Sequence, residues 1–494
     1  MEELSLRHNI FKKYVLIVLL AIISLQIPIF AAPSQSYTYD SYGKSVASPP
    51  VYEVSDVVNG INIGCDSLKK PNDMFVDKNG SIYILDTGNN RVIITKNNFK
   101  IEKIISSFNI DGKESPLNEP KGIYVDSKAN IYVADTGNNR VVLIDKEGNI
   151  KKQLLKPNSS AYDQEKDFLP VKVVADRSDN TYIISTGINE GIMVFDSEAK
   201  FQGFYGSNKV VQTTEVLTDF FWKQIMSKEQ KEQLGRQVPP ELRALDISED
   251  DFIFSLTNMN LSVWADYKDE ADKIRKLNPK GKDILVNKMP EYAQAAFEKD
   301  SKNLNYADTN YDENGFVNII DNLKGRILQF DSDMNLVIAF GTLGDYKGAF
   351  KNPSAIESYK EQLYVLDSSK CNITIFKLTD FGEKVHTAII VYSEGNYNAA
   401  ITPWNEVLKL NTNYEADYIG IGNAYLSQQE YLKAMEYFKI GRDSKKYNDA
   451  FKLYRISVIR KYFAFFVLGI LIFALFIVWI VKRKKTLTAN KDRM

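Results

Sequence analysis

The chain carries few of the residue types that most often do chemistry. Histidine occurs only at His8 and His386, and cysteine only at Cys65 and Cys371. Two histidines cannot build a His-rich metal site and leave little room for acid–base catalysis by imidazole. Two cysteines cannot complete a zinc site, but they can form one disulfide. These residue types therefore predict no catalytic set and no metal ligands.

Aspartates and asparagines, in contrast, recur at fixed spacing. The sequence Asp-Thr-Gly-Asn-Asn-Arg occupies residues 86–91 and again 135–140, an offset of 49 residues (135 − 86). A catalytic set has no reason to repeat, whereas a turn in a repeated fold does. Glycine and asparagine tolerate positive φ in tight loops, and aspartate accepts backbone N–H groups. We expect structural roles in these loops for Asp86, Gly88, Asn90, Arg91, Asp135, Gly137, Asn139 and Arg140.

A second set of acids also recurs, each at the same place in its unit, directly after an apolar run. Its members are Asp77, Asp126, Asp176 and Asp246. Asp and Asn oxygens are the ligands that Ca²⁺ prefers, so a channel or structural Ca²⁺ is an alternative role. Because the acids repeat from unit to unit, we interpret them as turn supports and predict no cofactor.

The elements that must position these residues form a repeat. Short alternating apolar segments are separated by Gly, Asn and Asp turns, which is typical of antiparallel strands. The six units lie near Pro71, Pro120, Pro170, Pro240, Phe316 and Pro353. One four-stranded sheet cannot bury both of its faces alone, but six arranged radially can. The pattern predicts a mainly β protein with a six-bladed β-propeller over residues 49–380.

These units resemble NHL repeats. The resemblance rests on the Asp-Thr-Gly-Asn-Asn-Arg stretch, preceded by Ile-Tyr-Ile-Leu at 82–85 and by Ile-Tyr-Val-Ala at 131–134. It implies a propeller used mostly for binding, with a minority of lyases and lactone hydrolases. Those enzymes need Glu, Asp, Asn or His ligands around a divalent cation in the central channel. The scarcity of histidine favours the binding role here.

The ends of the repeat region predict how the ring closes. Residues 49–58 have strand character, and the pattern turns helical near Phe381, directly after the last unit. We therefore expect the N-terminal segment to supply the outer strand of the sixth blade. Cys65 and Cys371 would then lie in loops on one face of the propeller, where a disulfide could join them. Two unrelated surface thiols are the alternative.

Two insertions, at 214–238 and 289–303, have a helical pattern. In the first, Phe221, Trp222, Ile225 and Met226 fall on one helical face. Aromatic side chains are frequent anchors of protein interfaces. This face is either a partner-binding surface or packs against the propeller.

Residues 381–447 have the pattern of paired helices with a 34-residue offset (431 − 397). The segment resembles two tetratricopeptide repeats, in which small residues let paired helices approach. The residues that carry the resemblance are Tyr397, Ala400, Trp404, Gly422, Tyr425, Ala434 and Phe438. Residues 448–462 would form a capping helix. The repeats would serve either as a stalk or as a groove for a peptide.

Segments near both ends of the chain predict that the protein is exported and anchored in a membrane. Residues 1–32 have a basic start, an apolar run and small residues at Ala31 and Ala32, as in a signal peptide; an uncleaved anchor is the alternative. Residues 463–481 carry no charge and as a helix would span about 28 Å. The basic tail, 482–494, favours the cytoplasmic side. The bulk of the chain would then be extracytoplasmic.

Composition narrows the function further. The chain has 62 basic and 63 acidic residues, so it lacks the basic excess of a nucleic-acid-binding protein. We predict a membrane-anchored extracytoplasmic scaffold that binds an envelope or membrane protein, for example within a transport complex, or a glycan. The alternative is a propeller enzyme of the lactone-hydrolase or lyase type with a divalent cation in its channel. A spacer without a ligand is the third possibility.

Overall fold

The computed structural model describes residues 36–40, 42–110, 112–206, 241–258, 274–285 and 305–491. The predicted signal peptide and both helical insertions lie outside the described residues, and so do Phe221, Trp222, Ile225 and Met226. The chain divides into two units, Met1–Gly382 and Glu383–Met494. The first contains the β-sheets and the second the helices.

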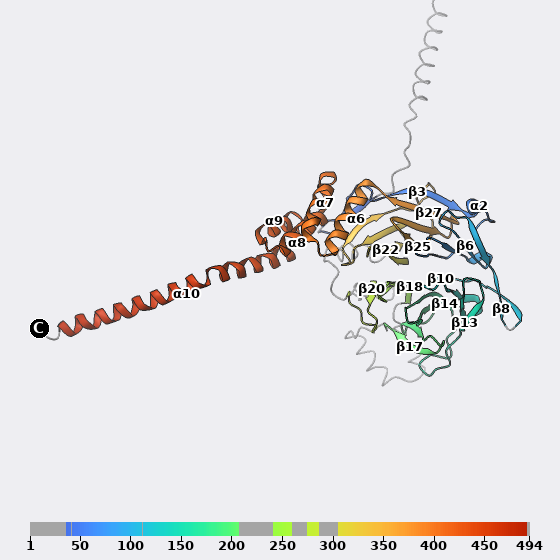
Figure 1. The fold of residues 1–494 in the computed structure, drawn as a ribbon, viewed down its shortest axis with the longest axis horizontal. Helices are drawn as coiled ribbons and strands as arrows, with labels where there is room; N and C mark the ends of the chain where they lie inside the picture. Colours follow the sequence, from blue (N-terminus) through green and yellow to red (C-terminus); the bar gives the residue numbers. More distant parts are fainter. Residues whose placement is uncertain are drawn as a thin grey trace, which may run out of the picture. The chain divides into compact units, whose positions relative to one another are not determined.

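The first unit is a six-bladed β-propeller, as predicted (Figure 1). Each blade is an antiparallel sheet, and four strands are described in every blade except the fourth, where three are described. Blades 1 to 3 comprise β4 (Asp73–Val76), β5 (Ile82–Asp86), β6 (Arg91–Thr95) and β7 (Ile101–Ile105); β10 (Gly122–Val125), β11 (Ile131–Asp135), β12 (Arg140–Ile144) and β13 (Ile150–Leu154); and β14 (Pro170–Ala175), β15 (Thr181–Ser185), β16 (Ile192–Phe195) and β17 (Phe201–Tyr205). Blades 4 to 6 comprise β18 (Glu241–Ile247), β19 (Ile253–Asn258) and β20 (Ile274–Leu277); β21 (Tyr306–Tyr311), β22 (Val317–Asp321), β23 (Arg326–Phe330) and β24 (Leu336–Phe340); and β25 (Pro353–Tyr359), β26 (Gln362–Asp367), β27 (Asn372–Leu378) and β3 (Tyr52–Asn59).

The hydrophobic core lies between neighbouring blades. The second strands β5, β11, β15 and β22 are buried along their whole length and are rich in the β-branched and aromatic residues that suit buried strands. One core cluster joins Ile84 of blade 1 to Leu366 of blade 6, and another joins Leu85 of blade 1 to Val133 of blade 2. Because each sheet buries both faces against its neighbours, no blade has a complete core alone.

The ring closes as the sequence predicted. β3 pairs antiparallel with β27, from Tyr52↔Leu378 to Asn59↔Asn372. The N-terminal segment thus completes the sixth blade. An additional hairpin, β1 (Tyr37–Tyr39) and β2 (Ser45–Ala47), extends the outer edge of blade 5, where Tyr37 pairs with Ala339. This extension was not expected from the sequence.

In blades 1, 2, 5 and 6 the repeated loop follows an aspartate at the end of the second strand. Asp86 accepts the backbone N–H of Lys69 at 2.7 Å and pairs with the Nε of Arg91 at 2.8 Å. Asp135 and Arg140 repeat the pair at 2.8 Å, and Asp321 and Arg326 at 2.9 Å. These contacts agree with the structural role expected of the loops.

The role expected of the loop glycines was only partly right. Positive φ occurs at Asn90 and Asn139, at +52° and +55°, and not at Gly88 or Gly137. The glycines are required by space instead, because a Cβ at Gly88 would lie 2.6 Å from the carbonyl oxygen of Lys69. Backbone from the preceding connection passes directly over this turn.

Both cysteines are free thiols in this structure, so the predicted disulfide is not formed in it. The Cys65 Sγ donates to the carbonyl oxygen of Gly60 at 3.4 Å, and the Cys371 Sγ to that of Ser368 at 3.5 Å. Each thiol therefore faces a carbonyl of its own turn. Both side chains pack against the same core cluster between blades 6 and 1.

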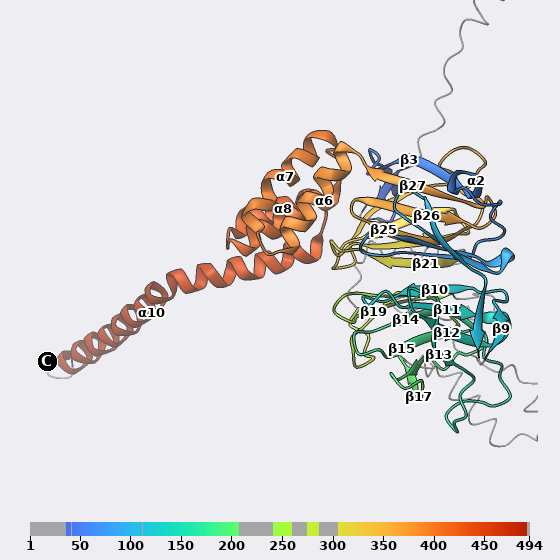
Figure 2. The same ribbon diagram turned by 45° about the vertical axis from the view of Figure 1, so that its right-hand side comes forward.

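The second unit is a series of helices, α6 (Asp380–Ser393), α7 (Tyr397–Leu410), α8 (Glu415–Ser427), α9 (Tyr431–Ile440) and α10 (Ser444–Lys491). From α7 onwards each helix packs on the next (Figure 2). Gly422 permits this approach, since a Cβ there would lie 2.6 Å from the ring of Phe438. Ala400 and Ala434, two of the predicted packing residues, are fully buried.

α10 is one continuous helix that contains both the predicted capping helix and the predicted span. In the described part of the chain it is the one helix long and apolar enough to cross a membrane, judged by length and composition. Its most apolar window has a mean hydropathy of 3.1, and none of that window is buried within the protein. The helix is therefore a candidate membrane span.

Candidate functional site in the propeller channel

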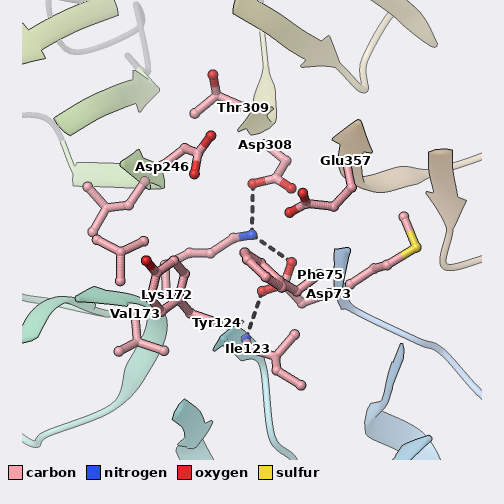
Figure 3. Close-up of a pocket in the computed structure, with 13 residues that line it drawn as sticks. Asp73, Phe75, Ile123, Tyr124, Lys172, Val173, Asp246, Asp308, Thr309 and Glu357 are labelled. Carbon is pink, nitrogen blue, oxygen red and sulfur yellow. Dashed lines mark hydrogen bonds and ion pairs between the residues drawn. The ribbon is translucent and has the colours of Figure 1, made fainter. Parts of the chain in front are cut away.

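The inner strands of all six blades line a cavity in the centre of the propeller (Figure 3). Its titratable side chains come one from each blade: Asp73 on β4, Tyr124 on β10, Lys172 on β14, Asp246 on β18, Asp308 on β21 and Glu357 on β25. The free volume is about 10 Å³, room for about one water molecule. The channel thus brings together four carboxyl groups and a single ammonium group.

Strand register explains why these side chains meet. Tyr124 pairs with Tyr132, Asp246 with Phe254 and Glu357 with Tyr364, so the three occupy the same place in their blades. Asp73 and Lys172 lie two residues earlier in their strands, relative to Phe75 and Val174. Alternate residues of a strand project to the same side. The channel is therefore lined in two adjacent layers.

The structure corrects the role predicted for Asp246. Asp77, Asp126 and Asp176 do support turns, each accepting two backbone N–H groups of its own hairpin. In blade 4 that turn position belongs to Ser248, whose hydroxyl accepts the N–H of Phe252 at 3.1 Å. Asp246 lies within β18 and faces the channel. Leu242 pairs with Thr257 at the same bulge where Pro170 pairs with Ser185 and Pro353 with Asp367. Leu242 is therefore the counterpart of these prolines, and counting from Pro240 places the turn two residues too early.

Lys172 is the centre of the site. Its Nζ lies 2.7 Å from an oxygen of Asp73 and 2.7 Å from an oxygen of Asp308, and all three side chains are largely buried. The two carboxylates raise the pKa of Lys172 above its usual range despite burial, so the ammonium stays charged. One side chain thereby links blades 1, 3 and 5 across the channel.

The carboxyl groups around Lys172 are difficult to ionise together. Burial raises the pKa of Asp73, and it raises the pKa of Asp308 to about 7, although Lys172 and backbone N–H groups of Ile123 and Ile356 oppose the shift. Desolvation disfavours the charged form of an acid, and neighbouring carboxylates add repulsion. The carboxyl groups of Asp73 and Asp308 both pair with the same ammonium group, that of Lys172.

Asp246 and Glu357 form no ion pair in the described part of the chain. Burial raises the pKa of Asp246 to about 6 and that of Glu357 well above its usual range. Asp246 accepts the backbone N–H groups of Tyr311 and Ile247, and Glu357 accepts the side-chain N–H of Asn310 at 3.3 Å. Both acids therefore bind protons at higher pH in the folded chain than exposed carboxyl groups do.

The chemistry open to this site is limited. The ammonium of Lys172 occupies the position between carboxylates that a cation would take, and the described residues contain no group of three His, Cys, Asp or Glu side chains able to hold a metal. His386 is buried in the helical unit, where burial lowers its pKa to about 3. Proton transfer by Asp246 or Glu357 is the chemistry that remains.

Comparison with known proteins supports the repeat assignment. The NHL repeat family model matches residues 117–142, within blade 2. No curated protein matches the chain. Similar solved structures include virginiamycin B lyase from Staphylococcus aureus, with 11% identity, 66% of this chain and 100% of that chain covered, and a TM-score of 0.41. A gluconolactonase from Xanthomonas campestris has 10% identity, coverage of 68% and 98%, and a TM-score of 0.38. At these values neither structure indicates an activity for this chain.

Proposed function

We propose that this protein is a membrane-anchored extracytoplasmic scaffold that binds another protein of the cell envelope or membrane. The observation that supports this most directly is the channel. A propeller enzyme offers its central channel to a substrate, whereas here Lys172 and its carboxylate partners fill that position. What the fold then presents to other molecules is its outer surface.

The helical unit supports the same function. The 34-residue offset between α7 and α9, with buried Ala400 and Ala434, is typical of tetratricopeptide repeats. Helical repeats of this kind are interaction modules. As a groove the pair would bind an extended segment of a partner, and as a stalk it would hold the propeller above the bilayer.

The proposed location of the protein rests on segments near the two ends of the chain. The signal-like residues 1–32 would export the chain, and α10 would anchor it, with Lys482 and Arg483 on the cytoplasmic side. An accessory subunit of a transport or envelope-assembly complex fits this arrangement. A glycan is the second class of partner. An enzyme with a divalent cation in the channel is less well supported, because Lys172 competes for that place.

In-cell photocrosslinking tests the proposal. A photoreactive residue replaces Trp222, in the insertion proposed as the partner surface, and the chain is purified through a tag on its C-terminal tail. We expect one recurrent envelope or membrane protein to be crosslinked, and less of it when Phe221→Ala is added. The control carries the photoreactive residue at Ile104, exposed on the outer strand of blade 1. Equal or absent crosslinking at both positions would contradict a scaffold that binds through this surface.

A further inference from the structure

The two cysteines lie at the place where the ring of blades closes. Cys371 directly precedes Asn372, the first residue of β27, and Asn372 pairs with Asn59, the last residue of β3. Cys65 lies in the connection that leaves β3 for blade 1, and both its N–H and its Sγ donate to the carbonyl of Gly60, the residue after Asn59. Both thiols therefore flank the same end of the β3–β27 ladder.

The repeat supplies a second and independent indication of what Cys371 does. The loop Asp367–Asn372 corresponds to Asp86–Arg91 in blade 1, since Asp367 and Asn372 pair across the hairpin as Asp86 and Arg91 do. Cys371 therefore takes the place of Asn90. Its φ is +53°, compared with +52° at Asn90, so the two side chains leave the backbone in the same direction.

In blade 1 this position joins one blade to the next. The side-chain oxygen of Asn90 accepts the N–H of Glu119 at 2.8 Å, in the connection that enters blade 2. The corresponding connection into blade 1 is the one that contains Cys65. Cys65 and Cys371 also contact the same buried cluster. At the point of closure a thiol thus occupies the asparagine position of this contact. The other thiol lies in the connection that the contact would reach, five residues before Lys70, the counterpart of Glu119.

We propose that Cys65 and Cys371 form a disulfide that closes the propeller ring covalently. The two thiols give up two protons and two electrons to a disulfide oxidant of the extracytoplasmic space, which leaves as a dithiol or as two thiols. One thiolate attacks the oxidant to give a mixed disulfide, and the second cysteine displaces the reduced oxidant. When the disulfide forms, each cysteine loses only one weak hydrogen bond, from its thiol to a carbonyl oxygen of its own turn.

The bond would act mainly on the unfolded chain. It joins residues 306 positions apart (371 − 65), and cross-links that close long loops remove the most freedom from the unfolded state. The bond would also keep β3, the strand that the N-terminal segment contributes to blade 6, from separating from β27. Oxidation requires export of the chain, so this part of the inference rests on the proposed extracytoplasmic location. The positions of the two cysteines in the fold do not depend on that location.

The experiment uses the full chain, purified in detergent under reducing conditions and then incubated with oxidised glutathione. Peptide mass spectrometry without reduction is expected to find residues 65 and 371 in one cross-linked pair. The midpoint of thermal unfolding should rise by about 5–10 °C on oxidation and return on reduction. Two thiols that both remain open to alkylation, or a bond formed only between two chains, would overturn the proposal.

A matched variant separates the bond from a folding defect. Cys371→Asn restores the residue found at position 90, so we expect it to fold with the midpoint of the reduced protein and without response to oxidant. Cys65→Ser should behave likewise, and the double variant should add nothing. An oxidant-dependent rise that persists in Cys371→Asn would contradict the assignment. Export is read separately: a disulfide formed in vitro but absent from protein taken from cells would argue against the extracytoplasmic address alone.

Discussion

At the scale of single residues, the channel depends on one cation surrounded by acids. Lys172 lies 2.7 Å from both Asp73 and Asp308, and removing one partner of a buried ion pair leaves the others without compensation. We expect Lys172→Met to lower the free energy of unfolding at pH 8 by about 3–5 kcal/mol, measured by chemical denaturation. The loss should shrink at pH 5.5, which is below the pKa of about 7 of Asp308, because a protonated partner needs no ammonium to balance its charge.

The control for this prediction is an ion pair on the surface. Lys128 lies 2.6 Å from Asp179, but both side chains are well exposed, and such pairs contribute little because water screens them. Lys128→Met should leave stability almost unchanged. Equal losses in the two variants would mean that the channel pair is not buried as described.

A second residue-scale prediction concerns pH. Acids with a raised pKa, such as Asp308 at about 7 and Asp246 at about 6, bind protons in the folded chain that the unfolded chain has already released. The folded state is therefore favoured at low pH, and the free energy of unfolding should fall as pH rises from about 4 to 7. Glu357, whose pKa is also raised, contributes to this slope.

Glu357→Gln tests the slope directly. The glutamine resembles the protonated acid, so we expect the variant to be at least as stable at pH 8 and to show a shallower decrease between pH 5 and 8. Denaturant midpoints at four pH values suffice. An unchanged slope would show that Glu357 is ionised throughout or lies outside the channel.

At the scale of elements, β3 is essential to the ring and the β1–β2 hairpin is not. β3 pairs with β27 along its length, whereas β1 pairs with β24 only at Tyr37↔Ala339. Deleting residues 36–49 should leave cooperative unfolding of the propeller intact, and deleting 36–59 should abolish it. Calorimetry of both proteins distinguishes them, and similar transitions would contradict closure by β3.

Substitution of Gly422 tests the close packing of helices in the second unit. A Cβ there would lie 2.6 Å from the buried ring of Phe438, whereas nothing lies within 4 Å of a Cβ at Gly469. Overpacking of this kind typically costs about 1–3 kcal/mol. We expect Gly422→Ala to lower the helical unfolding transition and to leave the propeller transition in place, while Gly469→Ala changes neither. A shift of the propeller transition alone would contradict the division into two units.

Short-range patterns made much of the fold predictable. Turn residues, alternating strands and the 49-residue offset identified the blades, and the chain left over at the N-terminus identified the closing strand. The channel could not be predicted in this way, because its titratable residues come from six different blades and are not of one type in all of them. Asp246 was misassigned because Leu242, not Pro240, is the counterpart of Pro170 and Pro353, and because a serine replaces the aspartate at the turn of blade 4. The free volume of a site depends on packing that no local pattern encodes.

At the scale of the whole molecule, we propose that a propeller and a helical unit are carried outside the cell by one membrane span. α10 has the length and composition for that span, and the basic residues near its C-terminal end, Lys482 and Arg483, would remain inside. The proposed binding partner and the proposed disulfide both require this topology. An enzyme acting on a cytoplasmic metabolite would require the opposite one.

Thiol labelling of intact cells measures the topology most directly. In a chain whose two native cysteines are replaced by serine, one new cysteine replaces Lys146, in an exposed turn of blade 2, or Thr488, in the C-terminal tail. We predict that a membrane-impermeant maleimide labels the propeller position on intact cells and labels the tail only after lysis. Labelling of the tail on intact cells, with the propeller protected until lysis, would contradict the account.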